Sequence, residues 1–136
     1  MQEGKVTLGY WGIRGLSERI RMLLEYVGIP YDEVKYTGET RDKWFSEVKP
    51  VLHKKNPAIT LPYLLDGDKV ISESDAIQVY IVHKAGKPEL LGRNADEHVA
   101  IATTMGVVRD LHAKYIALVY GRYGDITFEE AKAKSV

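Results

Sequence analysis

The sequence predicts an α/β domain built on a four-stranded mixed sheet, followed by a purely helical segment. Three observations predict this class. Over residues 1–85, short apolar or alternating runs and helical runs follow one another in the order β-α-β-α-β-β-α. A helix joins the first two strands and makes them parallel, whereas the Asp-Gly-Asp turn at 66–68 makes the last two antiparallel. After a linker at 86–92, residues 93–136 show only helical periodicity.

The first strand and helix enclose the most informative stretch of the chain. An apolar run at 6–8 leads to Tyr10, and two glycines then turn the chain into a helical pattern over 16–27. Gly28 ends that helix, because glycine is favoured just past a helix terminus. Apolar and polar residues alternate over 31–36, which predicts the second strand.

The middle of the chain predicts a short helix and a hairpin. A helical pattern over 41–48 is expected to end at Pro50, since proline cannot continue a regular helix. The basic stretch 51–60 is expected to be irregular. Strands at 61–65 and 69–71 form the two arms of the hairpin.

Helices complete the chain. Ser72 or Ser74 is expected to cap the helix after the hairpin. A long helical pattern runs from 94 to about 120, and a capping box at 127–130 starts another helix shortly before the sequence stops. We therefore expect one long helix and the beginning of a second after the linker.

The composition excludes several classes of function. The formal net charge is zero, so no basic excess argues for nucleic acid. No apolar run approaches the roughly 20 residues of a membrane span, and no secretory signal is visible, so the cytosol is the expected compartment. Cysteine is absent, which excludes disulfides and thiol redox chemistry. The four histidines lack metal-site spacing, and we expect no bound metal.

Tyr10 is the first candidate for chemistry. Its phenol follows a strand and precedes the amino terminus of a helix. Ligands bind at such points in α/β folds, and the free N–H groups of a helix N-terminus favour anions. The expected ligand is therefore small and negatively charged.

Two further pairs are candidate binding groups, each with an ordinary structural alternative. A cis bond before Pro62 would let Leu61 offer its backbone to an extended ligand, although spacing alone favours a trans proline. Glu73 and Ser74, at a helix N-terminus, suit the ammonium and carboxylate of an amino acid. Their alternative is a helix cap beside a solvated acid.

Arg41, Trp44 and Lys49 form a third group of donors, suited to a second carboxylate. A tryptophan on a short helix otherwise packs in the core. Together, the candidates describe an amino-acid head, an extended peptide, a terminal carboxylate and a group that needs a hydroxyl donor. One small molecule combines these features: glutathione.

The same residues resemble the glutathione-site motifs of the tyrosine-type glutathione transferases. The motifs are Tyr10-Trp11-x-Ile13-Arg14-Gly15-Leu16, Arg41-x-x-Trp44, Leu61-Pro62-Tyr63-Leu64 and Glu73-Ser74-x-Ala76-Ile77. The N-terminal region is most similar to the mu class, and the stretch 107–123 is similar to the fourth helix of the pi class. The resemblance implies a thioredoxin-like, glutathione-binding domain over 1–85 and a shortened helical domain over 93–136.

The resemblance also implies roles along the tripeptide. Tyr10 would donate a hydrogen bond to the glutathione sulfur. The binding groups would be Leu61 before a cis Pro62 for the cysteinyl backbone, Glu73 and Ser74 for the γ-glutamyl group, Trp44 with Arg41 and Lys49 for the glycyl carboxylate, and Trp11 and Leu16 along the cleft. Lowering a thiol pKa of about 8.5 by roughly two units needs about 2.7 kcal/mol. One charge-assisted hydrogen bond of about 1.5–3 kcal/mol, helped by a helix dipole, is sufficient.

The expected function is therefore that of a glutathione transferase, which detoxifies a hydrophobic electrophile by conjugation. In the family pattern a lysine of the glycyl site falls on Val48, next to Lys49. The short second domain leaves an apolar helix face over 101–119, which needs either a homodimer partner or other subunits to cover it. The alternative function is a transferase-derived module, catalytically weak or inactive, within a larger assembly.

Overall fold

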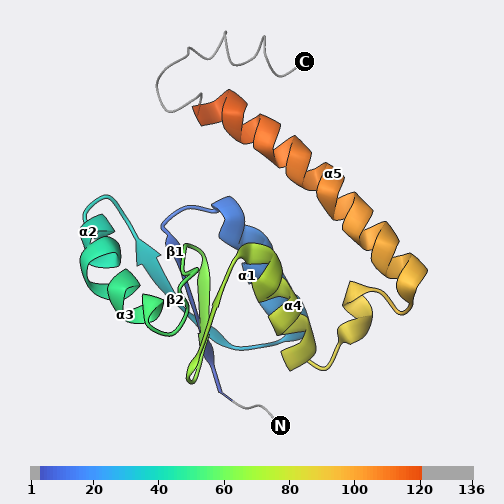
Figure 1. The fold of residues 1–136 in the computed structure, drawn as a ribbon, viewed down its shortest axis with the longest axis horizontal. Coiled ribbons are helices and arrows are strands. Elements are labelled where there is room, and N and C mark those ends of the chain that lie inside the picture. Colours follow the sequence, from blue (N-terminus) through green and yellow to red (C-terminus); the bar gives the residue numbers. More distant parts are fainter. Residues whose placement is uncertain (1–3, 121–136) are drawn as a thin grey trace. The chain divides into compact units, whose positions relative to one another are not determined.

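The computed structural model describes residues 4–120, which fall in two compact units that divide between Leu90 and Leu91. Helix α5 (Ala95–Tyr120) belongs to the second unit, and a 3₁₀ turn at Pro88–Leu91 precedes it (Figure 1). The elements of the first unit are, in order, β1 (Val6–Trp11), a 3₁₀ turn (Gly15–Ser17), α1 (Glu18–Val27), β2 (Tyr31–Tyr36), α2 (Arg41–Lys43), a π-helical turn η2 (Trp44–Val48), α3 (Lys49–His53), β3 (Tyr63–Asp66), β4 (Lys69–Ser72) and α4 (Ser74–Lys84).

The four strands form one mixed sheet in the order β2-β1-β3-β4. β1 and β2 are parallel because α1 connects them, whereas the tight turn at Gly67 makes β3 and β4 antiparallel. β3 also pairs antiparallel with β1. The predicted fold class, a four-stranded mixed sheet flanked by helices and followed by a helical segment, is confirmed.

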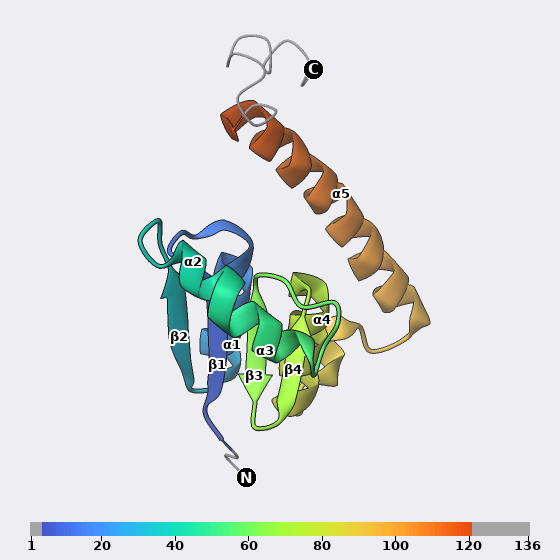
Figure 2. The ribbon, with the colours of Figure 1, turned by 60° about the vertical axis from the view of Figure 1, so that its left-hand side comes forward.

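Helices cover both faces of the sheet and create two separate cores. Figure 2 shows α2 and α3 on one face and α1 and α4 on the other. The core beneath α1 and α4 is aliphatic and consists of Val6, Leu8, Ile20, Leu24, Leu64, Ile77 and Ile81. The second core, on the η2 side, is mainly aromatic and consists of Tyr36, Trp44, Ile59 and Tyr63.

The alternation of β1 places neighbouring residues in different cores. Successive side chains of a strand point to opposite faces of the sheet. Val6 and Leu8 belong to the aliphatic core, and Tyr10 continues that side of the strand. Gly9 lies against the Tyr63 ring, and Trp11 packs on the aromatic core. The two cores therefore meet at the end of β1.

The helix predicted over 41–48 is longer than the sequence indicated. It continues to His53 through the π-helical turn η2, in which Lys49 donates its N–H to the carbonyl of Trp44. The prediction that Pro50 ends the helix, and that the chain is irregular from 51, was wrong. Pro50 lies in the first turn of α3, directly after the π-helical turn η2, so the turn that precedes it is not a regular α-helical one.

The segment between α3 and α4 corrects two further boundaries. β3 begins at Tyr63, not at residue 61. Neither Ser72 nor Ser74 caps α4: the N-cap residue is Glu73, without a side-chain cap. The Ser72 hydroxyl instead accepts the Thr60 N–H at 2.9 Å and donates to the Thr60 carbonyl at 3.3 Å, which ties the preceding loop to β4.

The long helix of the second unit agrees with the predicted one. Asn94 caps it, since its Oδ1 accepts the N–H of Glu97 at 3.0 Å. The further helix expected at 127–130 lies outside the described residues. Within residues 4–120, no helix has the length and apolar character that crossing a membrane would need.

Asp66 links the β3–β4 hairpin to the C-terminal half of α4, at the end of the sheet away from Tyr10. A single carboxylate oxygen, Oδ2, accepts both the Tyr80 hydroxyl at 2.5 Å and the Lys84 ammonium at 2.6 Å. Burial alone would raise the pKa of Asp66, but these hydrogen bonds outweigh burial and hold it below its usual range. Burial, and then the bond to Asp66, raise the pKa of Tyr80 to about 12.

We expect Asp66→Asn to lower the free energy of unfolding at neutral pH by about 1.5–3 kcal/mol. The folded-state pKa of Asp66 is depressed, so its contribution is present above the unfolded-state pKa and is lost as pH falls through the folded value. The difference between wild type and variant should therefore shrink below about pH 4. Urea unfolding at neutral and acid pH measures it.

Asp68→Asn is the matched control for Asp66→Asn. The Asp68 carboxylate pairs with Lys55 at 2.8 Å but is fully exposed, so its removal should change stability very little. A difference between wild type and Asp66→Asn that stays constant down to strongly acid pH would contradict the role given to this carboxylate.

Candidate functional site

The sheet register brings the predicted site residues to one edge. Ser72 pairs with Tyr63, and Tyr63 pairs with Gly9, so β1 and β4 end at the same edge where β3 begins. The residues just beyond this level are Tyr10 on β1, Pro62 before β3 and Glu73 after β4. Three segments far apart in the sequence thus present their candidate groups side by side.

Tyr10 is almost buried, with 7% of its surface exposed, and its hydroxyl has a fixed partner. The hydroxyl oxygen accepts the backbone N–H of Leu16, at 3.2 Å, where the chain enters the turn before α1. Because the oxygen is the acceptor in this bond, the hydroxyl proton is available for donation to another group. The N–H groups at this helix entrance add a positive electrostatic potential.

Gly15 allows the approach of the Tyr10 hydroxyl. A Cβ at this position would lie 2.7 Å from the hydroxyl oxygen and 2.9 Å from the ring. Its φ of +43° is also unfavourable for other residues. The glycine predicted only as a turn residue therefore has a second role, which is to leave room for the phenol.

Arg21 holds the loop between β1 and α1, and the sequence did not single it out. Its guanidinium contacts the carbonyls of Ile13, at 3.4 Å, and of Arg14, at 3.3 Å. The carboxylates of Glu18 and Glu33 flank the guanidinium. Burial alone would raise the pKa of Glu33, but its hydrogen bonds from Arg21 and Lys35 lower it, so it stays ionised. Only the charge pattern of α1 and β2 hinted at this network.

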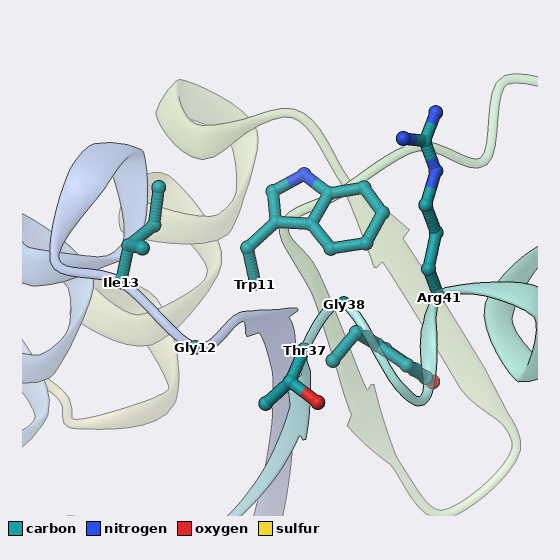
Figure 3. Close-up of a pocket in the computed structure, with 7 residues that line it drawn as sticks. Trp11, Gly12, Ile13, Thr37, Gly38 and Arg41 are labelled. Carbon is teal, nitrogen blue, oxygen red and sulfur yellow. The ribbon is translucent and has the colours of Figure 1, made fainter.

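An open pocket of about 530 Å³ lies beside the end of β1. It is lined by Trp11, Gly12, Ile13, Tyr36, Thr37, Gly38 and Arg41. Figure 3 shows the indole nitrogen of Trp11 and the guanidinium of Arg41 on the same side of this opening. The Phe45 ring is close to both side chains: its centroid is 6.2 Å from that of the Trp11 ring and 5.4 Å from the Arg41 Cζ atom. An N–H donor and a cation thus share one side of the pocket, which suits a carboxylate.

Trp44 lies in the aromatic core, which is the alternative to a binding role that the sequence left open for it. Only 2% of its surface is exposed, and its ring stacks on that of Tyr63 at 5.6 Å and 15°. The structure therefore does not bring the Trp44 ring into the pocket that contains Trp11 and Arg41.

The π-helical turn η2 determines where Lys49 lies. In a regular helix Val48 would follow Trp44 by one turn, but here the bond from Lys49 to Trp44 spans five residues. Lys49 therefore takes the place, one turn after Trp44, that Val48 would otherwise occupy. Val48 packs against the aromatic core instead.

The Leu61–Pro62 peptide bond is cis, as the resemblance implied. Pro62 is fully buried, while Leu61 is half-buried and lies on the aromatic core. Among the hydrogen bonds found in residues 4–120, none involves the backbone of Leu61. Its N–H and C=O are available to a ligand strand.

Glu73 and Ser74 occupy the start of α4. Glu73 is exposed and has a φ of 68° and a ψ of 124°, an unusual conformation for a residue other than glycine. Ser74 is buried, with 6% of its surface exposed. Glu73 is the N-cap residue of α4, so it adjoins the first turn, whose backbone N–H groups lack partners within the helix. Among residues 4–120, no cluster of His, Asp and Glu side chains could hold a metal ion.

Comparison with known proteins identifies clear relatives. Residues 6–83 match the family model described as "Glutathione S-transferase, N-terminal domain". Glutathione S-transferase Mu 5 of Homo sapiens is 40% identical over 134 residues, which cover 95% of this chain and 57% of the relative. The class-mu 26 kDa isozyme 51 of Fasciola hepatica is 36% identical over 128 residues, which cover 92% and 53%. The chain thus spans about half the length of these relatives.

Solved structures show the same fold. A monomeric glutathione S-transferase of the hookworm Necator americanus, Na-GST-3, has a TM-score of 0.69 at 20% identity. The match covers 96% of this chain and 60% of the hookworm chain. A glutathione transferase homolog from Sulfitobacter, solved with bound glutathione, has a TM-score of 0.66 at 20% identity and covers 96% and 63%.

Proposed function

Because the chain belongs to the glutathione S-transferase family, we propose that it binds glutathione and activates the thiol for transfer to an electrophilic carbon. One observation supports the chemical step above all others. The Tyr10 hydroxyl accepts the Leu16 N–H at 3.2 Å and so keeps its own proton for a second partner. That partner is the glutathione sulfur.

The energy of this contact fits the task. A thiol of ordinary pKa near 8.5 is mostly protonated at neutral pH, and the protein must favour its thiolate. A hydrogen bond from a neutral phenol to a thiolate contributes about 1.5–3 kcal/mol. The N–H groups at the entrance of α1 add to it. The thiolate then attacks the electrophile, forms a carbon–sulfur bond and displaces the leaving group with its electron pair.

The rest of the tripeptide extends along the edge of the sheet. Glu73 pairs with the γ-glutamyl ammonium, and Ser74 with the N–H groups of α4 accepts the γ-glutamyl carboxylate. The free backbone of Leu61 pairs with the cysteinyl residue. Trp11 and Arg41 share one side of the pocket and bind the glycyl carboxylate, which assigns to Trp11 a donor role first expected of Trp44.

Two measurements on the whole chain test the proposal. Calorimetry with reduced glutathione should show binding, and a turnover assay with glutathione and an aryl halide should show conjugation. A native mass measurement under the same conditions identifies the active assembly. Binding without turnover would instead support the transferase-derived module, and no binding would end the proposal.

We expect Glu73→Gly to change stability and affinity in opposite directions. Glycine adopts the positive φ of 68° without strain, so the free energy of unfolding should rise by about 1 kcal/mol. The substitution also removes the carboxylate that pairs with the ligand's ammonium, so the Kd for glutathione should rise about ten-fold or more. Urea unfolding and calorimetry measure the two effects.

Glu73→Gln is the matched control, since it keeps the backbone conformation and removes only the charge. It should weaken glutathione binding without a gain in stability. An affinity for glutathione that survives in both variants would exclude Glu73 from the binding site.

A further inference from the structure

Two buried tyrosines, Tyr36 at the end of β2 and Tyr63 at the start of β3, form a hydroxyl pair within the aromatic core. Their hydroxyl oxygens are 2.9 Å apart, and each residue has only 2% of its surface exposed. Two phenylalanines would fill the same space, because each differs from tyrosine only by the hydroxyl. The pair therefore contributes something other than volume, namely a directional contact between β2 and β3.

Tyr63, one member of this pair, contacts the strand that carries Tyr10. The Cβ that Gly9 lacks would fall 2.5 Å from the Tyr63 hydroxyl, so the tip of this side chain rests against the backbone of β1. Gly9 directly precedes Tyr10 in β1. The position of the Tyr63 hydroxyl thus affects the strand that presents the catalytic phenol.

Tyr36, the other member of the pair, contacts the residues at the end of β1 that line the pocket. Tyr36 pairs with Trp11 in the β1–β2 ladder, and its carbonyl accepts the Gly12 N–H at 2.7 Å. The Trp11 ring meets the Tyr36 ring edge-on at 6.3 Å. Tyr36 itself lines the pocket that Trp11 and Arg41 share.

Trp44 connects both tyrosines to the helical segment that contains Arg41. Its ring lies 5.5 Å from that of Tyr36 and stacks on that of Tyr63 at 5.6 Å. Arg41 and Trp44 are three residues apart, in the adjoining α2 and η2. A shift of the tyrosine pair would therefore move both the indole of Trp11 and the guanidinium of Arg41.

We infer that the Tyr36–Tyr63 hydrogen bond is a positioning contact that fixes Trp11 and Arg41 at a set distance from Tyr10. On this basis it selects ligands that contain both a thiol and a carboxylate one residue beyond it. The inference rests on the proposed function. It assigns to this buried hydroxyl pair the discrimination between glutathione and γ-glutamylcysteine, which lacks the glycine.

The Tyr36–Tyr63 hydrogen bond is expected to persist at neutral and moderately alkaline pH. Burial raises the pKa of Tyr36, and burial together with the bond to Tyr36 raises that of Tyr63 further. Both hydroxyls therefore stay protonated in this range of pH. The ratio of the affinities for glutathione and for γ-glutamylcysteine should not change there.

Calorimetry of Tyr36→Phe with glutathione and with γ-glutamylcysteine tests the inference. We expect the preference for glutathione over the dipeptide to fall about five-fold, because the loss concerns the glycyl end alone. Tyr26→Phe is the matched control: it removes the hydroxyl of a tyrosine that is 69% exposed and should leave the preference unchanged. Equal weakening of both ligands by Tyr36→Phe would overturn the inference.

The double variant Tyr36→Phe/Tyr63→Phe separates positioning from stability. Removing one hydroxyl leaves the other buried without a partner, whereas removing both leaves none. The double variant should therefore regain much of the stability lost by Tyr36→Phe, but its preference for glutathione should stay low. A preference that returns with stability would show that the pair acts only through stability.

A ligand-free measurement keeps the inference separate from the proposed function. The sequence contains two tryptophans, so the indole N–H region of an NMR spectrum holds two signals, assignable by substitution. Tyr36→Phe should shift the Trp11 signal, whereas Tyr26→Phe should not. If the wild type bound neither thiol ligand, the proposed function would fail, and an unmoved Trp11 signal in Tyr36→Phe would by itself overturn the positioning role.

Discussion

Replacing Tyr10 by phenylalanine is expected to leave glutathione binding nearly intact and to lower turnover by ten-fold or more. Only the hydroxyl is lost, so the ring still fills its nearly buried position at the end of β1. The lost hydrogen bond to the thiolate is worth about 1.5–3 kcal/mol, which corresponds to a factor of roughly 10 to 150. Turnover with glutathione and an aryl halide, together with calorimetry, measures the two effects.

The ionisation of bound glutathione gives an independent readout of the same substitution. The pKa of the bound thiol, followed by thiolate absorbance, should rise toward its ordinary value in Tyr10→Phe. Tyr80→Phe removes a hydroxyl at the opposite end of the sheet and should leave the thiol unaffected. Loss of glutathione binding in Tyr10→Phe would show instead that Tyr10 is structural.

Gly9→Ala is expected to destabilise the fold by about 3 kcal/mol. The added methyl group would lie 2.1 Å from the Cζ atom of Tyr63 and 2.3 Å from Cε1, distances that no packed side chain tolerates. Tyr63 cannot move aside easily, because Trp44 stacks on its ring and Tyr36 binds its hydroxyl. Urea unfolding measures the loss.

Gly38→Ala is the matched control for this substitution. A Cβ at Gly38 has no atom within 4 Å, so the same chemical change should alter stability by about 0.5 kcal/mol or less. Combining Gly9→Ala with Tyr63→Leu should recover part of the loss, since the shorter side chain leaves space for the methyl group. Strict additivity of the two substitutions would contradict the contact between Gly9 and Tyr63.

The order of strands and helices was predictable because most of the signals that define each element lie within that element or next to it in the sequence. Glycines and prolines mark the ends of most elements, and the period of apolar residues distinguishes strands from helices. The errors concerned the start of β3, the cap of α4 and, most clearly, the end of the helix at Pro50. Sequence patterns assume regular helix geometry, and the π-helical turn before Pro50 departs from it.

The site was predictable in part for a similar reason. Tyr10, Leu61 and Glu73 lie next to strand ends, and strand ends are visible in the sequence. The contacts that surround them were not visible, since they join residues distant in the chain. Arg21 meets Glu33, and Tyr36 meets Tyr63, only after the sheet has assembled.

The sequence by itself determined the order of strands and helices, the phenol at the end of β1 and the absence of cysteine from the chain, because residue type and spacing encode these directly. Only the tertiary structure decided that Trp44 is buried while Trp11 and Arg41 share a pocket, and that Gly9 and Gly15 leave space for Tyr63 and Tyr10. The physical reason is that close packing between elements follows from their positions in space, which spacing along one segment does not specify.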